Sequence, residues 1–183
     1  MKKILKICGI SLNALLLSAC VQKYDTLPNI RVLKTCETPI VAYEVGFIKQ
    51  GDYDDLKIPQ DKIKLAIENS LKESGCFIEN KNANTHNNYR LDVVYGSIKT
   101  QDSTDGFWKK DSSKGLIFEV QYSFKNFNST KIFYGKTRIH NNNRQYLNFI
   151  GKSATLDNNE IAITLQNAIN SATNEAIKGF IKK

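Results

Sequence analysis

The four cysteines are the residues of this chain best suited to covalent chemistry, because a thiol can be acylated, bind a metal or form a disulfide. They stand at positions 8, 20, 36 and 76. Cys20 follows a basic start and a short apolar run from Ile7 to Leu17. This order is typical of a secretory signal peptide. At roughly 1.5 Å per residue the run is too short to cross a hydrocarbon core of ~30 Å, so we expect it to direct export and not to span a membrane.

The residues just before Cys20 indicate which modification its thiol receives. Leu17, Ser18, Ala19 and Cys20 match the lipobox, and here the chain resembles the bacterial lipoprotein family. The resemblance implies a diacylglyceryl group on the Cys20 thiol, cleavage before Cys20, and acylation, for example with palmitate, of the new amino terminus. Two or three acyl chains hold a protein on a bilayer, whereas one holds it only marginally. The expected organisation is a signal peptide over residues 1–19, a lipidated tether over 20–29 and one domain over 30–183.

The residue after the lipidated cysteine bears on location. Enterobacterial lipoproteins with Asp at this position tend to stay at the inner membrane, and this chain has Val21 instead. The resemblance therefore implies a lipid-anchored protein of the cell envelope, at the outer membrane and facing the periplasm.

Cys36 and Cys76 remain after the leader is removed and the anchor is formed. In an oxidising compartment such a pair is a candidate disulfide. Two buried, reduced thiols are the alternative. A zinc site is not expected, because two distant cysteines without paired histidines do not supply four tetrahedral ligands.

Residues suited to catalysis are sparse. The only two histidines, His86 and His140, lie in or beside asparagine-rich stretches. No nucleophile-elbow, phosphate-loop or metalloprotease motif accompanies them. We therefore expect neither catalytic residues nor a cofactor, and we expect a protein that is not an enzyme.

The stretch Gln101 to Gly115 combines aromatic and basic residues in a polar context. Phe107 and Trp108 are followed by Lys109 and Lys110. On a flexible loop between strands, this combination suits a partner's groove or the headgroup zone of a membrane. The alternative is that the two aromatic residues fold back over the edge of the sheet.

A second basic pair lies further along the chain. Lys136 and Arg138 are two residues apart in a predicted strand, so their side chains point to the same side. Such a pair could contact the phosphate or carboxylate groups of an anionic ligand. A solvated sheet face is the alternative.

The elements that position these residues follow from hydrophobic periodicity. Alternating apolar residues predict strands, and apolar residues at helical spacing predict amphipathic helices. Val41, Tyr43, Val45 and Phe47 are expected on one strand face, and the turn after Lys125 is expected to form a hairpin. Asp157 with Glu160 resembles a capping box at the start of the last helix. The predicted strands are at 41–47, 89–95, 118–124 and 132–140, and the predicted helices are at 59–74 and 157–180.

The order β-α-β-β-β-α predicts an α+β domain. We expect a mostly antiparallel four-stranded sheet with both helices packed on one face. The whole chain has a net charge of +8, but Lys2, Lys3 and Lys6 of the leader supply part of it. A mildly basic envelope domain is not expected to bind nucleic acid. Another envelope protein or an anionic lipid surface is the expected partner.

Beyond the anchor, three segments carry a second resemblance. They are YRLDVVYGSIK, the hairpin FEVQYSFKNFNSTKIFYGKTRIH and the alanine-rich last helix. With the element order, they resemble lipopolysaccharide-assembly lipoproteins of the LptE kind, and also uncharacterised lipoproteins of the same build. The LptE resemblance implies a partner barrel, which is LptD in that case, and glycolipid binding. The first hypothesis is an interaction or assembly subunit of an envelope complex, and the second is an LptE-like glycolipid-binding protein.

Overall fold

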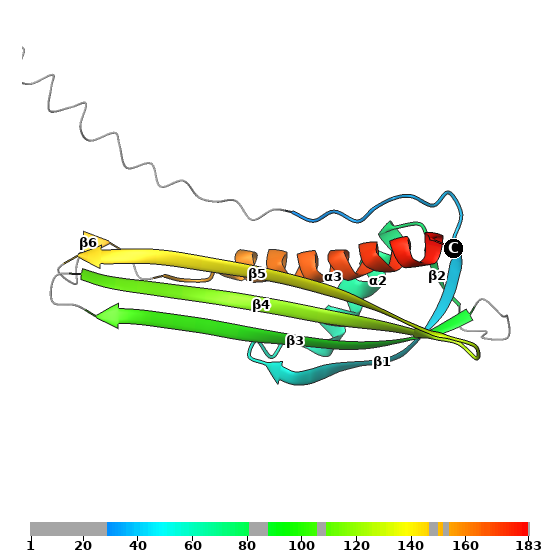
Figure 1. The fold of residues 1–183 in the computed structure, drawn as a ribbon, viewed down its shortest axis with the longest axis horizontal. Helices are drawn as coiled ribbons and strands as arrows, with labels where there is room; N and C mark the ends of the chain where they lie inside the picture. The colour runs from blue at the N-terminus through cyan, green and yellow to red at the C-terminus, as the bar shows by residue number, and fades with distance from the viewer. Residues whose placement is uncertain (1–28, 81–87, 106–108, 147–149, 152–153, 183) are drawn as a thin grey trace, which may run out of the picture.

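The computed structural model describes residues 29–80, 88–105, 109–146, 150–151 and 154–182. Cys20, Phe107 and Trp108 therefore lie outside the described residues. The chain forms an α+β fold in which two helices lie on one face of a long sheet (Figure 1). The elements are β1 (Val41–Asp54), α2 (Gln60–Glu73), β2 (Phe77–Glu79), β3 (Asn88–Asp105), β4 (Lys109–Lys125), β5 (Thr130–Tyr146), β6 (Ile150–Gly151) and α3 (Asn158–Ile181).

The sheet is mixed and has the strand order β2-β1-β3-β4-β5-β6. β1 runs parallel to β2 and to β3, whereas β3, β4, β5 and β6 pair antiparallel in sequence order. The predicted α+β class is confirmed, and the predicted sheet matches in part: most of its pairs are antiparallel, but it has six strands, not four, and β1 pairs in parallel with both of its neighbours. The difference has a physical reason: α2 carries the chain back, so that β2 starts at the same end as β1. With three residues, β2 is too short to show alternation.

The segment from Gln101 to Gly115 is also different from the expected flexible loop. β3 pairs with β4 continuously from Arg90↔Lys125 to Asp105↔Lys110, so most of this segment is strand. Its residues are polar on both faces, because this end of the sheet extends beyond α3 (Figure 1). Backbone pairing, and not burial, forms this part of the hairpin. We call residues 99–105, 109–115 and 140–143 the polar arm.

Close packing of α3 on the sheet forms the core. Alanines at positions 168, 172 and 176 are fully buried, and they face the inner side of β4 and β5. Asp157 accepts a hydrogen bond from the Glu160 amide at 2.7 Å, and the Glu160 side chain accepts one from the Asp157 amide at 2.9 Å. The predicted capping box is therefore confirmed. The predicted antiparallel hairpin at the turn after Lys125 is also confirmed.

β1 departs from regular alternation at its centre. Its pairing with β3 shifts between Val45 and Ile48, which is the behaviour of a β-bulge. The bulge buries Ile48 and turns Phe47 to the outer face, where 36% of Phe47 is exposed. The prediction that Phe47 shares a face with Val41 and Tyr43 is therefore wrong, because strict alternation does not include an inserted residue.

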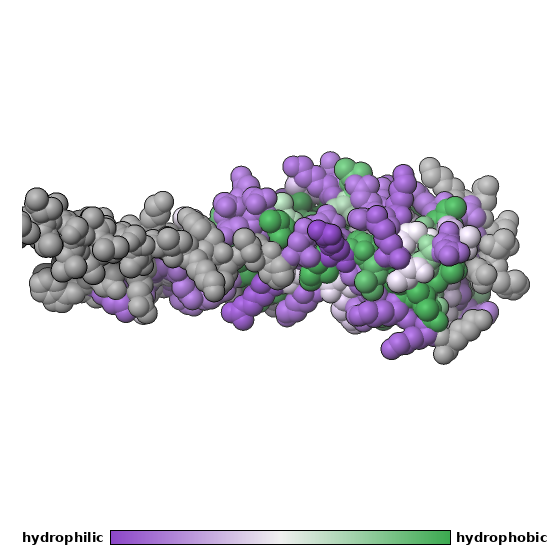
Figure 2. Space-filling view, turned by 90° about the horizontal axis from the view of Figure 1, so that it is seen from above, coloured by the Kyte–Doolittle hydropathy of each residue, from purple (hydrophilic) through white to green (hydrophobic). Residues whose placement is uncertain are grey.

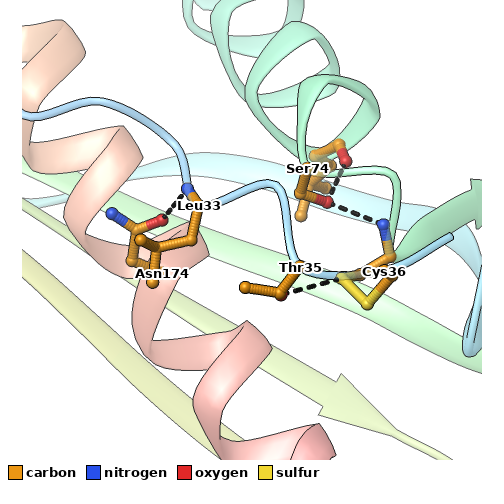
Figure 3. The surroundings of a disulfide bond; sticks show 7 residues. Leu33, Thr35, Cys36, Ser74 and Asn174 are labelled. Atoms are coloured by element: carbon orange, nitrogen blue, oxygen red, sulfur yellow. Dashed lines mark hydrogen bonds between the residues drawn. A yellow bond between two sulfur atoms is a disulfide. The ribbon is translucent and has the colours of Figure 1, made fainter.

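A strap of extended chain, residues 30–36, lies along α3 and ends at a disulfide (Figure 3). The Ile30 amide donates to Asn167 at 2.7 Å, and Asn170 donates back to the Ile30 carbonyl at 2.7 Å. Asn174 accepts from the Leu33 amide at 2.8 Å and donates to the Arg31 carbonyl at 2.9 Å. Spacings of three and four residues place these asparagines on one helix face. The asparagines of α3 therefore form hydrogen bonds with the strap's backbone groups, as a neighbouring strand would.

The strap is closed by Cys36 and Cys76, whose Cα atoms lie 5.1 Å apart in a disulfide. The predicted bridge is confirmed. Cys76 is positioned by Gly75, which adopts a positive φ of 71° after the end of α2, and by the Ser74 hydroxyl, which accepts from the Cys76 amide at 3.0 Å. Glycine suits this left-handed position because it has no Cβ to clash.

Candidate interaction surface

The face of the sheet opposite the helices is hollowed at its centre. The hollow has a volume of about 310 Å³ and is lined by the second half of β1 and the middle of β3, β4 and β5. Large apolar side chains reach its surface: Tyr53 is 70% exposed, Tyr134 62% and Ile98 38%. Core-forming residues on these strands point the other way, toward α3. We call this side of the sheet the open face.

Strand register explains which residues meet on the open face. Three ladders cross β3, β4 and β5 side by side: Val94, Gln121 and Tyr134; Gly96, Glu119 and Lys136; Ile98, Ile117 and Arg138. Since every second side chain in a strand points to the same face, these residues lie together. Gly96 also lets β1 approach closely, because a Cβ at Gly96 would come within 2.6 Å of the Tyr53 carbonyl oxygen.

The predicted basic pair lies at one side of this hollow. Lys136 and Arg138 are both exposed and point to the open face, with buried Gly135 and Ile139 on the inner side. Lys136 forms an ion pair with Glu119 of β4. Arg138 stands opposite Ile117, and within the part of the chain that the structure describes no carboxylate pairs with it. Arg138 is thus the cation of the pair that a ligand or partner could engage without displacing a neighbour.

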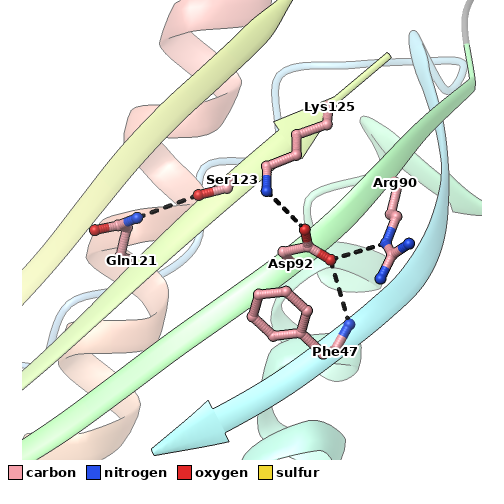
Figure 4. A network of polar contacts seen from close by, with 6 residues as sticks. All are labelled: Phe47, Arg90, Asp92, Gln121, Ser123 and Lys125. Carbon is pink, nitrogen blue, oxygen red and sulfur yellow. Dashed lines mark hydrogen bonds and ion pairs between the residues drawn. The ribbon is translucent and has the colours of Figure 1, made fainter. Parts of the chain in front are cut away.

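A buried carboxylate stands on the same face, on β3 between β1 and β4 (Figure 4). Asp92 has a side chain only 5% exposed and accepts from Arg90 Nε at 3.0 Å and from Lys125 Nζ at 2.9 Å. The Phe47 amide in the β1 bulge donates to the same carboxylate at 3.3 Å. Burial alone would raise the pKa of Asp92, but the hydrogen bonds and charges of Lys125 and Arg90 outweigh burial and hold the pKa below 3.8. Asp92 therefore stays ionised and fixes the bulge.

The other predicted basic pair is already engaged within the sheet. Lys109 Nζ lies 2.7 Å from Asp111 Oδ2, and Lys110 Nζ lies 3.1 Å from Asp105 Oδ1. Phe107 and Trp108 are outside the described residues, so the predicted partner or membrane contact remains a prediction for all four. Lys109 and Lys110 lie at the tip of the polar arm, far along the sheet from the hollow (Figure 1).

Within the described residues, no three histidine, cysteine or acidic side chains are placed to hold a metal ion. A helix long and apolar enough to cross a bilayer is likewise absent from that part of the chain. Two tyrosines in the core, Tyr43 and Tyr122, have a raised pKa, chiefly because burial disfavours the phenolate. The Tyr122 hydroxyl lies 3.5 Å from the Thr173 hydroxyl, so this buried tyrosine contributes to the packing of β4 against α3.

Comparison with known proteins gives a limited result. No protein-family model matches this chain, and no curated protein matches it. Among solved structures, it is similar to a provisionally named neuraminyllactose-binding hemagglutinin homolog from Helicobacter pylori. The TM-score is 0.40 at 12% identity, over 87% of this chain and 90% of that one. A hypothetical protein from Chlamydia trachomatis is similar with a TM-score of 0.30 at 13% identity, over 78% and 92% of the two chains.

Sequence reasoning missed the hollow itself. Tyr53 and Ile98 lie beyond the ends of the strands predicted at 41–47 and 89–95, and Tyr134 lies beside Phe133, which packs against the core on the other face. A signal was available in KIFYGKTRIH, where Ile132 and Tyr134 flank Phe133, which is partly buried against the core. Apolar residues on both faces of one strand indicate a sheet with a second contact surface.

Proposed function

We propose that this chain is a lipid-anchored cell-envelope protein that acts as a non-enzymatic interaction or assembly subunit. Cys20 in the lipobox-like stretch would carry the lipid, and the outer membrane facing the periplasm would be its place. The disulfide between Cys36 and Cys76 supports an oxidising compartment. The strap supports a mechanical role for the short tether, because three asparagines and the disulfide fix the start of the domain, where a tether would join it.

The observation that carries the proposal is the open face of the sheet. Monomeric proteins seldom leave large aromatic and aliphatic residues together in a concave surface unless something binds there. Tyr53, Ile98 and Tyr134 do so here, beside the charges of Lys136 and Arg138. A macromolecular partner suits an open, shallow surface better than a catalytic reaction does, since catalysis requires groups held away from water.

The test has two arms that address anchor and surface separately. Mass spectrometry of the native protein should find a cleaved, acylated Cys20, and Cys20→Ala should leave the membrane fraction. Quantitative crosslinking in intact cells should then recover a defined partner with the native protein, and Tyr134→Ala should reduce that recovery. Glu37→Ala, a change at an exposed residue directly after the strap and distant from the hollow, is the matched control. An unmodified Cys20 would contradict the anchor, and equal recovery with Tyr134→Ala would contradict the surface.

Glycolipid binding in the LptE manner is the second candidate function. It is favoured by the apolar walls of the hollow together with a cation pair that could meet lipid phosphates. Purified protein should then retain lipopolysaccharide, and Lys136→Glu with Arg138→Glu should weaken that retention. Binding that is unchanged by the double substitution would remove these residues from lipid recognition.

A further inference from the structure

β5 has a long free edge. β4 pairs with β5 over its whole length, from Thr130 to Tyr146. On the other side, β6 pairs only with residues 145 and 146. From Thr130 to Asn143, no strand in the described part of the chain occupies that side of β5. An unpaired edge of this length is a template for another strand, which natural proteins usually shield.

The hairpin turn determines which residues of β5 present their backbone to the free edge. The Asn126 amide donates to the Ser129 carbonyl at 2.9 Å, so these two residues form a hydrogen-bonded pair. In an antiparallel ladder such pairs alternate with pairs whose amide and carbonyl groups point away. Counting from Ser129, the outward-pointing backbone groups belong to the even-numbered residues: Thr130, Ile132, Tyr134, Lys136 and Arg138.

These same even-numbered residues carry the side chains of the open face. Ile132 and Tyr134 are 47% and 62% exposed, and Lys136 and Arg138 follow them. A strand added at the edge would therefore bond to their backbone and also contact their side chains. Viewed from the side on which β5 and α3 lie, the surface shows hydrophobic residues between hydrophilic ones (Figure 2).

Charge decides what kind of strand the edge would accept. β5 contains Lys131, Lys136, Arg138 and Arg144 and no acidic residue between positions 130 and 146. A second copy of the chain would bring an equally basic β5 against the first, and like charges across a strand pair are destabilising. An acidic strand is complementary instead.

Resting on the proposed interaction function, we propose that the free edge of β5 takes up an extended segment of a partner protein by strand addition. The segment has apolar residues at two alternate positions, next to Ile132 and Tyr134. It has acidic residues at the following two alternate positions, next to Lys136 and Arg138. Main-chain hydrogen bonds would supply affinity, and the alternating side chains would supply specificity. In this proposal, the acidic groups that Lys136 and Arg138 bind belong to a protein strand.

The test uses the purified full-length protein in mild detergent and two synthetic peptides, TVTVTETET and its reverse, which cover parallel and antiparallel pairing. Hydrogen exchange followed by NMR reports the amides of Ile132, Tyr134, Lys136 and Arg138, which should gain protection when one peptide binds. The peptide TVTVTKTKT and its reverse are the charge controls and should bind about tenfold more weakly. Arg138→Glu should lower the affinity for the acidic peptide about tenfold and raise that for the lysine peptide.

Comparing Tyr134→Pro with Tyr134→Ala separates the edge from the surface, because both remove the side chain and only the proline variant also removes the amide. Tyr134→Pro removes an amide that does not bond to β4, so the fold should be kept, and peptide binding should be lost. Tyr134→Ala keeps that amide and should retain weaker binding. Absence of amide protection with every peptide, or equal protection by acidic and basic peptides, would overturn the proposal. If protection of these amides grew with protein concentration in the absence of peptide, the edge would pair with a second copy of the chain, and the proposed partner strand would be wrong. None of these outcomes affects the lipid anchor or recovery of a partner through the hollow.

Discussion

Gly135 of β5 lies directly against the backbone of Ala168 in α3. A Cβ atom built on Gly135 would overlap the Ala168 carbonyl oxygen and would come within 2.7 Å of the Ala172 amide nitrogen. Helix and strand therefore touch backbone to backbone at this point. With no side chain between them, α3 can bury its alanines against the sheet.

Gly135→Ala should lower the free energy of unfolding by about 1–3 kcal/mol, because the added methyl group forces the helix away from the strand. Urea unfolding followed by circular dichroism measures this loss. Gly51→Ala is the matched control, since a Cβ at Gly51 would meet its nearest neighbour at 3.4 Å, an ordinary contact. Equal stability of the two variants would show that α3 does not rest on Gly135.

Asp92→Asn should lower the free energy of unfolding at pH 7 by about 1.5–3 kcal/mol, the usual range for hydrogen bonds to a charged group. The variant loses the ion pairs to Lys125 and Arg90, and both of those side chains are partly exposed, so the loss should fall at the lower end. Glu175→Gln is the control, because it removes an ion pair in which both side chains are exposed. The comparison uses urea unfolding under identical salt.

The Asp92 carboxylate should also make the free energy of unfolding depend on pH in the acid range. Its pKa in the folded protein lies below its ordinary value of 3.8. The stabilisation from Asp92 is therefore fully present above that ordinary value and is lost as the pH falls through the lower pKa of the folded protein. Unfolding measured between pH 6 and pH 2 should show a smaller acid dependence in Asp92→Asn than in the native protein. Parallel curves for the two proteins would contradict this assignment.

Reduction of the Cys36–Cys76 bridge should lower the free energy of unfolding by about 4 kcal/mol in the chain-entropy model, given the 40-residue separation of the cysteines. It should also raise the exchange rates of the Ile30 and Leu33 amides, because the strap then loses its covalent link and keeps only its noncovalent contacts with α2, α3 and the core. The double variant Cys36→Ser with Cys76→Ser is the control and should not respond to reductant. If that variant also lost stability in reductant, the loss would not come from the Cys36–Cys76 disulfide.

Local signals were sufficient for the parts of the fold that local chemistry forms. Apolar spacing predicted α2 and α3, Asp157 and Glu160 predicted the helix cap, and the polar turn after Lys125 predicted the hairpin. The disulfide followed from counting cysteines after the export signal was identified. In each case, residues within a few positions of one another, or a single remaining pair, determine the outcome.

Nonlocal pairing explains what sequence reasoning missed. β1 lies beside β3 in parallel, although more than thirty residues separate the two strands, and no turn motif predicts that neighbour. The polar arm forms strands through backbone bonds, so its side chains show no apolar alternation. The bulge at Phe47 depends on Asp92, which belongs to another strand. The hollow lies where the second half of β1 meets β3, β4 and β5, and therefore could not be found from the order of predicted elements alone.

The cap of α3 also holds the polar arm, and two substitutions should separate these roles. Glu160 accepts from the Asp157 amide at 2.9 Å and from Asn141 Nδ2 of β5 at 3.0 Å. Asp157→Ala removes only a helix cap and should cost about 1 kcal/mol of stability. Glu160→Ala removes the cap contact and the Glu160 contact with Asn141, and leaves only the bond from Asn141 to the Thr155 carbonyl at 2.9 Å, so amides near Asn141 should exchange faster in this variant alone. Equal exchange in the two variants would show that the contact between Glu160 and Asn141 adds nothing to the order of the arm.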